Sequence, residues 1–399
     1  MQYEITPVTE LHWRISRFQQ KLREDEIPGA LINQNTDLFY FAGTIQRSFL
    51  FIPAEGEAVL AVAGNIQRAK EECGLANVVP LNNNKQLGTV MADFGYQLKG
   101  KIGLEMDTLP ASYYLSLQGN NREADYVDVS ELIKQTRMVK APYERERIKK
   151  ACQITCEVME LARNTIKEGM TELELDSVLI AFTRKKGHMG LFRARAYNQE
   201  LNYSHILAGQ SSALSTYVKG PLGGKGTTPA ISLGAGFGVI TRNLPIIVDY
   251  GMGYHGYASD MTRTFVVGKL PVDLEKAFDV TREVKYLTKE WVKPGLCPAD
   301  LYSEIIKLVR KRGYEDNFMG CKPYQVPFVG HGFGLDIDEY PVITPMFKLN
   351  FEPGMVFSLE PKMAFPGTGA VGIEDDFLVT GSGVELLTDY QDTIIEIKP

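Results

Sequence analysis

The sequence has few cysteines and lacks the patterns of a disulfide or zinc framework. Only five of its 399 residues are cysteine, an odd number, and no two of them form a CxxC pair. A small secreted domain would carry a dense, even set, and a structural zinc site would carry closely spaced thiols. We therefore expect free thiols and a reducing, cytoplasmic location.

Long apolar runs and a strong excess of one charge are also missing. No stretch approaches the roughly 18 apolar residues of a membrane span, and the first residues lack the basic end and apolar run of a signal peptide. The net charge of −6 gives no basic surface for nucleic acid or for an anionic membrane. We expect a soluble protein that binds neither.

The chain does contain enough apolar residues for two domains. Hydrophobic residues make up 44% of it, and its length allows two substantial cores. Short helix-like and strand-like segments up to about residue 130 predict an α/β domain. The polar stretch 134–147 contains Pro142 and precedes a long amphipathic helix, which predicts a boundary there. The expected domains are residues 1–138 and 139–399.

The second domain contains an internal repeat. Residues 167–187 and 293–313, at an offset of 126, share eight of 21 positions, whereas average composition gives about one or two. Amphipathic helices that end in basic residues and glycine resemble one another to some extent anyway. Because both copies also begin with Lys-x-Gly, we predict two related halves, each a helix pair with a sheet. The same offset relates His205 to His331, so both should reach one cleft.

Four carboxylates and one histidine lie on strand-like stretches of this domain. Asp249 and Asp260 flank one predicted hairpin, Glu360 and Glu374 flank a second, and His331 lies in the glycine-rich VGHGFGLD. Simple pairing would place each acid pair face to face, with Cβ atoms about 5 Å apart. Buried carboxylates that close require a positive partner. Any one of these acids could be a strand-edge residue, but two symmetric pairs and a histidine favour a metal centre.

The ligand types narrow the choice of metal. One imidazole and several carboxylates suit Mn²⁺, Co²⁺, Zn²⁺ or Fe²⁺ better than a metal that prefers thiolates. Calcium fits less well, because no single loop carries a dense run of oxygen ligands. We expect two divalent ions, preferably Mn²⁺, holding a hydroxide that attacks a carbonyl group.

Four segments, taken together, resemble the pita-bread metallopeptidase family. They are DYG…SDMTRTFVVG, GHGFGLD, EPGMVFSLEP and VGIEDDFLVT. The resemblance covers about residues 140–399. The first 135 or so residues resemble the creatinase-type N-terminal domain of the Xaa-Pro aminopeptidase and prolidase branch. The resemblance implies an α/β N-terminal domain and an α+β pita-bread catalytic domain with a pseudo-twofold. It also implies a homodimeric exopeptidase that cleaves Xaa-Pro bonds of small peptides.

The resemblance assigns a role to each member of the set. Asp249 would bind one ion, Asp260 and Glu374 would bridge both, and His331 and Glu360 would complete the other. Glu360 would in addition act as the catalytic group that moves a proton of the attacking water. The neighbouring Thr-Arg pair at 262–263 would support the metal ligands without binding the metal itself.

The sequence departs from the family at two histidine positions. Asp338 stands where GLDxHE would place a histidine, and residues 214–218 contain none. His205 could replace one of them, as a catalytic or substrate-binding group, or could be an ordinary histidine at a strand edge. Arg195 lies in LFRARAYNQE, where alternation along a strand could present its guanidinium to a substrate carboxylate. A solvated strand face explains that pattern equally well.

Two other functions are compatible with the same residues. Because a fold does not fix a reaction, the metals could serve a hydrolase or lyase that acts on a small non-peptide substrate, and the missing histidines favour this reading. A binding module without catalysis would be expected to lose metal ligands, whereas all five are present. We therefore predict a metallopeptidase of the Xaa-Pro aminopeptidase or dipeptidase type.

Overall fold

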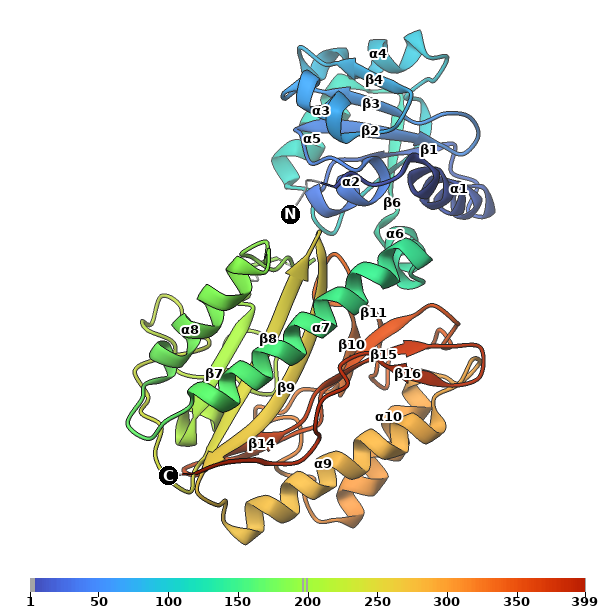
Figure 1. Ribbon diagram of the computed structural model, residues 1–399. Helices are drawn as coiled ribbons and strands as arrows, with labels where there is room; N and C mark the ends of the chain where they lie inside the picture. Colours follow the sequence, from blue (N-terminus) through green and yellow to red (C-terminus); the bar gives the residue numbers. More distant parts are fainter. Residues whose placement is uncertain (1–3, 196, 199, 399) are drawn as a thin grey trace. The chain divides into compact units, whose positions relative to one another are not determined.

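A computed structural model describes residues 4–195, 197–198 and 200–398. The chain forms two compact units, shown in Figure 1. Met1–Arg137 and Arg195–Asn198 make up the first, and Met138–Ala194 and Gln199–Pro399 the second. Among the described residues, no helix combines the length and the apolar character needed to cross a bilayer.

The first unit is a mixed sheet with helices. Its strands follow the order β4-β3-β2-β1-β5-β6, with β1 antiparallel to β2 and parallel to β5. Its core joins side chains of several strands to those of α4 and α5. The strands are β1 Gly29–Ile32, β2 Ser48–Pro53, β3 Val59–Val62, β4 Asn77–Pro80, β5 Gly100–Leu104 and β6 Ala124–Asp128, and the helices are α1 Val8–Glu24, α2 Asn35–Ala42, α3 Ile66–Glu72, α4 Leu87–Asp93, α5 Ala111–Asn120 and α6 Ser130–Met138.

The second unit contains two larger sheets, of order β17-β9-β8-β7 and β11-β10-β12-β15-β16, and the separate hairpin β13-β14. Its helices are α7 Pro142–Thr165, α8 Glu172–Lys185, α9 Val272–Trp291 and α10 Pro298–Lys311. Its strands are β7 Ser204–Ala208, β8 Pro245–Tyr254, β9 Tyr257–Val267, β10 Gly330–Gly332, β11 Glu339–Val342, β12 Val356–Leu359, β13 Lys362–Phe365, β14 Gly369–Gly372, β15 Asp375–Val379, β16 Val384–Leu386 and β17 Ile395–Ile397.

The structure confirms the internal repeat. An offset of 126 carries both ends of α8, Glu172 and Lys185, onto the ends of α10, Pro298 and Lys311. It also carries the last residue of α7 onto the last residue of α9. The predicted α/β domain followed by an α+β domain of two related halves is therefore the architecture of the chain.

In the sheet that contains β8 and β9, helices α7 and α8 cover one face, and the other face carries both apolar and polar side chains. On β8, Val248 and Tyr250 belong to the core cluster that includes residues of α7 and α8. Successive side chains of a strand point to opposite faces, so Asp249 points away from that core. On β9, Met261 and Phe265 join the same core, which leaves Asp260 on the opposite face, the same face as Asp249.

The register of the first hairpin differs from the prediction. Asp249 pairs with Thr262, and Asp260 pairs with Gly251, so the two aspartates are diagonal neighbours. The cause is a two-residue turn at His255 and Gly256, both with positive φ, at 48° and 91°. Such turns match the twist of the flanking strands. The predicted face-to-face pairing of the two aspartates would require a turn centred one residue earlier.

The register of the second hairpin is confirmed. Lys362 pairs with Gly372, and Phe365 with Gly369, which is the symmetry about Gly367 that the sequence predicts. Beyond the hairpin, Leu359 pairs with Asp375 in the larger sheet at the same register. Glu360 and Glu374 therefore lie opposite each other between the two ladders.

Candidate metal centre

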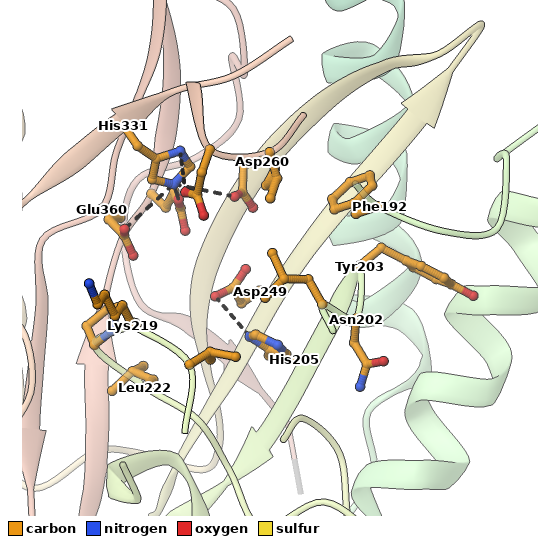
Figure 2. A pocket seen from close by; sticks show the side chains of 18 of the residues that line it. Phe192, Asn202, Tyr203, His205, Lys219, Leu222, Asp249, Asp260, His331 and Glu360 are labelled. Atoms are coloured by element: carbon orange, nitrogen blue, oxygen red, sulfur yellow. Dashed lines mark ion pairs between the residues drawn. The ribbon is translucent and has the colours of Figure 1, made fainter. Parts of the chain in front are cut away.

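The five predicted side chains converge on one pocket of the second unit. Asp249 and Asp260 come from β8 and β9, and His331 comes from β10. Glu360 follows β12 directly and Glu374 precedes β15 directly. Figure 2 shows side chains from both sheets turned toward the same space. Two strand pairs and one glycine-flanked strand thus bring together residues up to 125 positions apart.

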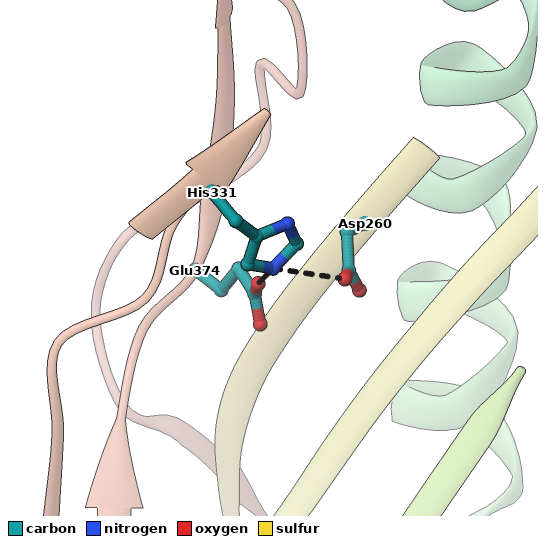
Figure 3. A group of neighbouring side chains, drawn as sticks. All are labelled: Asp260, His331 and Glu374. Carbon is teal, nitrogen blue, oxygen red and sulfur yellow. Dashed lines mark ion pairs between the residues drawn. The ribbon is translucent and has the colours of Figure 1, made fainter. Parts of the chain in front are cut away.

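His331 is the centre of one group of ligand atoms. Its Nε2 lies 3.9 Å from Asp260 Oδ2, 3.7 Å from Glu360 Oε1 and 4.0 Å from Glu374 Oε1. Ligand atoms of one ion, each about 2.1 Å from it, lie up to about 4 Å from one another. Ligand atoms of Asp260, His331 and Glu374 all lie within 4.8 Å of one another (Figure 3), slightly above this separation. These residues fit a divalent ion.

The charge on His331 depends on the surrounding carboxylates. Burial disfavours the charged imidazole, but Asp338, Glu360 and Glu374 outweigh it and raise the pKa of His331 to about 9. Without an ion, the imidazolium supplies positive charge to this part of the cluster. A metal ion would take the place of the ring proton, because metals bind neutral imidazole.

Lys362 was not predicted as a site residue, yet it lies within the carboxylate cluster. Its Nζ donates hydrogen bonds to Asp249 Oδ2 at 2.9 Å, Glu360 Oε2 at 3.0 Å and Glu374 Oε2 at 2.8 Å. Only 3% of the side chain is exposed. The sequence contained a signal for this residue. Lys362 is a lone lysine in an apolar strand, and it stands two residues after Glu360, so both side chains should point to the same face.

The two aspartates differ in their electrostatic environment. Burial opposes ionisation of Asp249, but the ammonium of Lys362 outweighs it and holds the pKa of Asp249 below its ordinary value. The pKa of Asp260 is raised well above its ordinary value by burial, and then by Glu374 and Asp249. The ammonium of Lys362 therefore compensates Asp249 more fully than Asp260.

The neighbouring Thr-Arg pair supports the centre, as the family resemblance implies. Thr262 Oγ1 donates to Glu374 Oε2 at 2.7 Å, and Ser358 Oγ donates to Glu374 Oε1 at 2.9 Å. Arg263 is fully buried and donates to the main-chain oxygen of Glu374 and to Asp375 Oδ1, at 2.8 and 2.7 Å. These bonds fix the orientation of the Glu374 carboxylate.

His205 lies in the same pocket, directly opposite Asp249 in the β7–β8 ladder. Its Nδ1 is 3.9 Å from Asp249 Oδ2 (Figure 2). Within the described residues its Nε2 is buried and has no hydrogen-bond partner. Burial, the largest influence, lowers the pKa of His205, which favours a neutral ring. Such a ring can donate or accept one hydrogen bond from a bound molecule.

The two positions without histidine have different surroundings. Asp338 lines the pocket, with 52% of its side chain exposed and its Oδ1 3.6 Å from His331 Nδ1. Thr216 is not among the residues that line the pocket, and its hydroxyl donates to the main-chain oxygen of Ser232 at 2.6 Å. Asp338 therefore lines the pocket at one of these positions, and from the stretch 214–218 it is Val218 that does so.

Arg195 does not take the position that the prediction gave it. It lies outside any strand and is grouped with the first unit, and it does not line the pocket. Its guanidinium forms an ion pair with Asp37 and donates to both carboxylate oxygens of Asp107, at 2.9 and 3.0 Å. Only 4% of its side chain is exposed. We therefore revise the substrate contact predicted for Arg195 to a structural ion pair.

The fold and the site together define a two-domain metal-dependent hydrolase of the aminopeptidase and prolidase type. Comparison with known families agrees. Residues 146–381 match the model of metallopeptidase family M24, and residues 14–139 match that of the creatinase/prolidase N-terminal domain. The chain therefore belongs to metallopeptidase family M24.

Individual relatives extend over nearly the whole chain. An Xaa-Pro dipeptidase of Pyrococcus furiosus is 27% identical over 378 residues, covering 94% of this chain and 97% of the relative. An uncharacterized peptidase of Staphylococcus saprophyticus is 27% identical over 393 residues, covering 95% and 99%. Among solved structures, an Xaa-Pro dipeptidase from Bacillus anthracis has a TM-score of 0.82 at 25% identity, covering 97% and 100%. The prolidase from Pyrococcus furiosus has a TM-score of 0.77 at 26% identity, covering 94% and 99%.

Proposed function

We propose that this protein is a metal-dependent exopeptidase that cleaves the Xaa-Pro bond of small peptides. The observation that carries the proposal is the meeting of Asp249, Asp260, His331, Glu360 and Glu374 in one pocket of a family M24 domain. Relatives named Xaa-Pro dipeptidase and prolidase, similar over almost their full length, support the choice of substrate.

The metal ligands are assigned from the same residues. Asp260, His331, Glu360 and Glu374 would hold a divalent ion, Mn²⁺ by preference, with Co²⁺, Zn²⁺ or Fe²⁺ also suited to this ligand set. The family pattern adds a second ion on Asp249. A bound ion supplies Lewis-acid chemistry, because it makes water more acidic and polarises a carbonyl group.

Glu360 would be the proton-transfer group. Burial and then the neighbouring Glu374 raise its pKa to about 7, against the opposing effects of Lys362 and His331. A carboxylate within reach of the attacking water can both accept a proton and return it. Glu360 would therefore take the proton of the attacking water and deliver it to the leaving imino nitrogen of proline.

His205 would position the substrate. Its buried Nε2 lacks a hydrogen-bond partner among the described residues, and its ring lines the pocket beside Asp249. A peptide carbonyl or terminal group placed there would satisfy this nitrogen. His205 would in this way take over part of the role of the absent family histidines. We also propose a homodimer and a cytoplasmic location, as the family resemblance and the free cysteines suggest.

Hydrolysis of a peptide panel tests the proposal. Purified protein loaded with Mn²⁺ is given Xaa-Pro dipeptides and Xaa-Pro-containing tripeptides, with the matching Xaa-Ala peptides as controls. We expect cleavage that is selective for proline, abolished by a chelator and absent from an Asp260→Ala variant. Metal binding without cleavage of any Xaa-Pro peptide would contradict the proposal and would direct the search to small non-peptide substrates.

A further inference from the structure

Lys362 occupies the space between three of the predicted metal ligands. Its ammonium is within 3.0 Å of an oxygen of Asp249, Glu360 and Glu374, and its side chain is buried. Three carboxylate oxygens around one buried cation satisfy all three donors of an ammonium group. Lys362 is therefore a fixed member of the cluster.

The hairpin is shaped to admit this side chain. Lys362 pairs with Gly372 across β13 and β14. A Cβ atom at position 372 would come within 2.7 Å of Lys362 Cγ, closer than real Cβ contacts. The absence of a side chain at Gly372 thus provides room for the lysine stem next to the carboxylates.

In both Glu360 and Glu374, one carboxylate oxygen faces Lys362 and the other faces His331. Oε2 of Glu360 and Oε2 of Glu374 accept hydrogen bonds from Lys362. Oε1 of the same two residues faces His331 Nε2, at 3.7 and 4.0 Å. The pattern is that of two carboxylates bridging two positive centres, one of which is an ammonium group.

A second metal ion would compete with this ammonium directly. An ion bound to Asp249 would need a carboxylate oxygen about 2.1 Å away, on an aspartate that Lys362 already contacts at 2.9 Å. Two divalent ions would by themselves neutralise the four carboxylates. Adding the ammonium would place like charges a few ångströms apart in a poorly solvated site, which is unfavourable.

We propose that the protein binds one divalent ion per chain, held by Asp260, His331 and the Oε1 atoms of Glu360 and Glu374, and that Lys362 takes the place of the second ion. This revises the sequence-based expectation of two ions. It rests on the metal dependence in the proposed function, but not on peptides being the substrate.

Metal stoichiometry and the spectrum of bound Mn²⁺ test this proposal without any substrate. Metal-free protein is equilibrated with Mn²⁺, freed of excess ion and measured by elemental analysis and electron paramagnetic resonance. We expect one Mn²⁺ per chain with the spectrum of an isolated ion. The Lys362→Ala variant, prepared in Mn²⁺, should bind two ions and show the coupled spectrum of ions about 3.5–4 Å apart.

Lys285→Ala is the matched control. Lys285 is also a buried lysine, on α9, bonded to Asp375 and Asp392, and its loss should leave one ion per chain. Two ions in the unaltered protein would overturn the inference and leave metal dependence intact. No bound ion would overturn both. One ion in a folded Lys362→Ala variant would overturn the inference, because the ammonium would then not be what excludes the second ion. If that variant fails to fold, the number of ions bound by the unaltered protein decides between one ion and two.

Discussion

Glu374 is the most constrained side chain of the centre. Its two oxygens accept from Ser358, Thr262 and Lys362, and Oε1 also faces His331. A carboxylate with this many donors is held in one orientation, which prepares it to bind an ion without rearrangement. The precision of the site thus depends on hydroxyl groups that touch no metal.

The hydroxyl of Thr262 should therefore affect metal affinity. Thr262→Val keeps the shape of the side chain and removes the donor to Glu374 Oε2. We expect the affinity for Mn²⁺ to fall about 10- to 100-fold, measured by isothermal titration calorimetry. Thr264→Val is the control, because Thr264 is buried on the same face of β9 but bonds to the main chain of Gly372. Equal losses in the two variants would contradict the role given to Thr262.

The role proposed for His205 predicts a separation of catalysis from metal binding. His205→Ala should lower kcat/KM on an Xaa-Pro dipeptide by about 10²-fold while the metal content stays unchanged. His255→Asn is a suitable control, since His255 lies in the β8–β9 turn with φ of 48°, which asparagine tolerates. If the His205 variant lost its metal instead, the residue would have to be assigned to the metal ligands.

At the scale of elements, the two hairpins show which parts of the site a sequence can predict. Bare carboxylates on strand-like segments are too costly to bury without a cation, so the pattern alone pointed to the four acids and the histidine that meet in the pocket. The register of β8 and β9 could not, because His255 adopts the left-handed conformation that the prediction did not assign to it. Lys362 was missed because a single lysine in a strand is usually a solvated side chain.

His188, in the segment after α8, should make the free energy of unfolding depend on pH. His188 is 2% exposed, packs against Tyr203 and accepts a hydrogen bond at Nδ1 from the main chain of Gly190. Burial, and more weakly Arg184, lower its pKa to about 4, compared with about 6.5 when unfolded. Because the unfolded chain binds the proton more readily, this contribution is complete above pH 6.5 and is lost as the pH falls toward 4.

Urea unfolding at several pH values measures this effect. Between pH 6.5 and 4 the unaltered protein should lose up to about 3 kcal/mol more of its free energy of unfolding than His188→Phe. Phenylalanine keeps a ring against Tyr203 and cannot titrate. Parallel stability profiles for the two proteins would mean that His188 is not the group responsible.

For the whole molecule, the repeat was the most informative sequence feature. Its offset of 126 predicted two helix pairs whose ends the structure reproduces, and it predicted that His205 and His331 reach the same pocket. The position of Arg195 was not predictable in this way. Its partner Asp37 is 158 residues away, and no local periodicity reports a contact at that distance.

The ion pairs of Arg195 should stabilise the first unit and should not affect metal binding or catalysis. Asp37 is fully buried, and although burial opposes its ionisation, Arg195 and Arg137 lower its pKa to about 2. Arg195→Met removes one partner of a buried carboxylate, which typically costs about 3–5 kcal/mol. Calorimetry should show a transition at lower temperature, with KM and metal content preserved. A raised KM at unchanged stability would instead support the substrate contact.

The measurement that tests the central claim most directly is anomalous diffraction from crystals grown with Mn²⁺, recorded at the manganese absorption edge. The account predicts one anomalous peak, in contact with Asp260, His331 and Glu374, and the ammonium of Lys362 seated among Asp249, Glu360 and Glu374. Two peaks, with the lysine side chain displaced from the carboxylates, would contradict it.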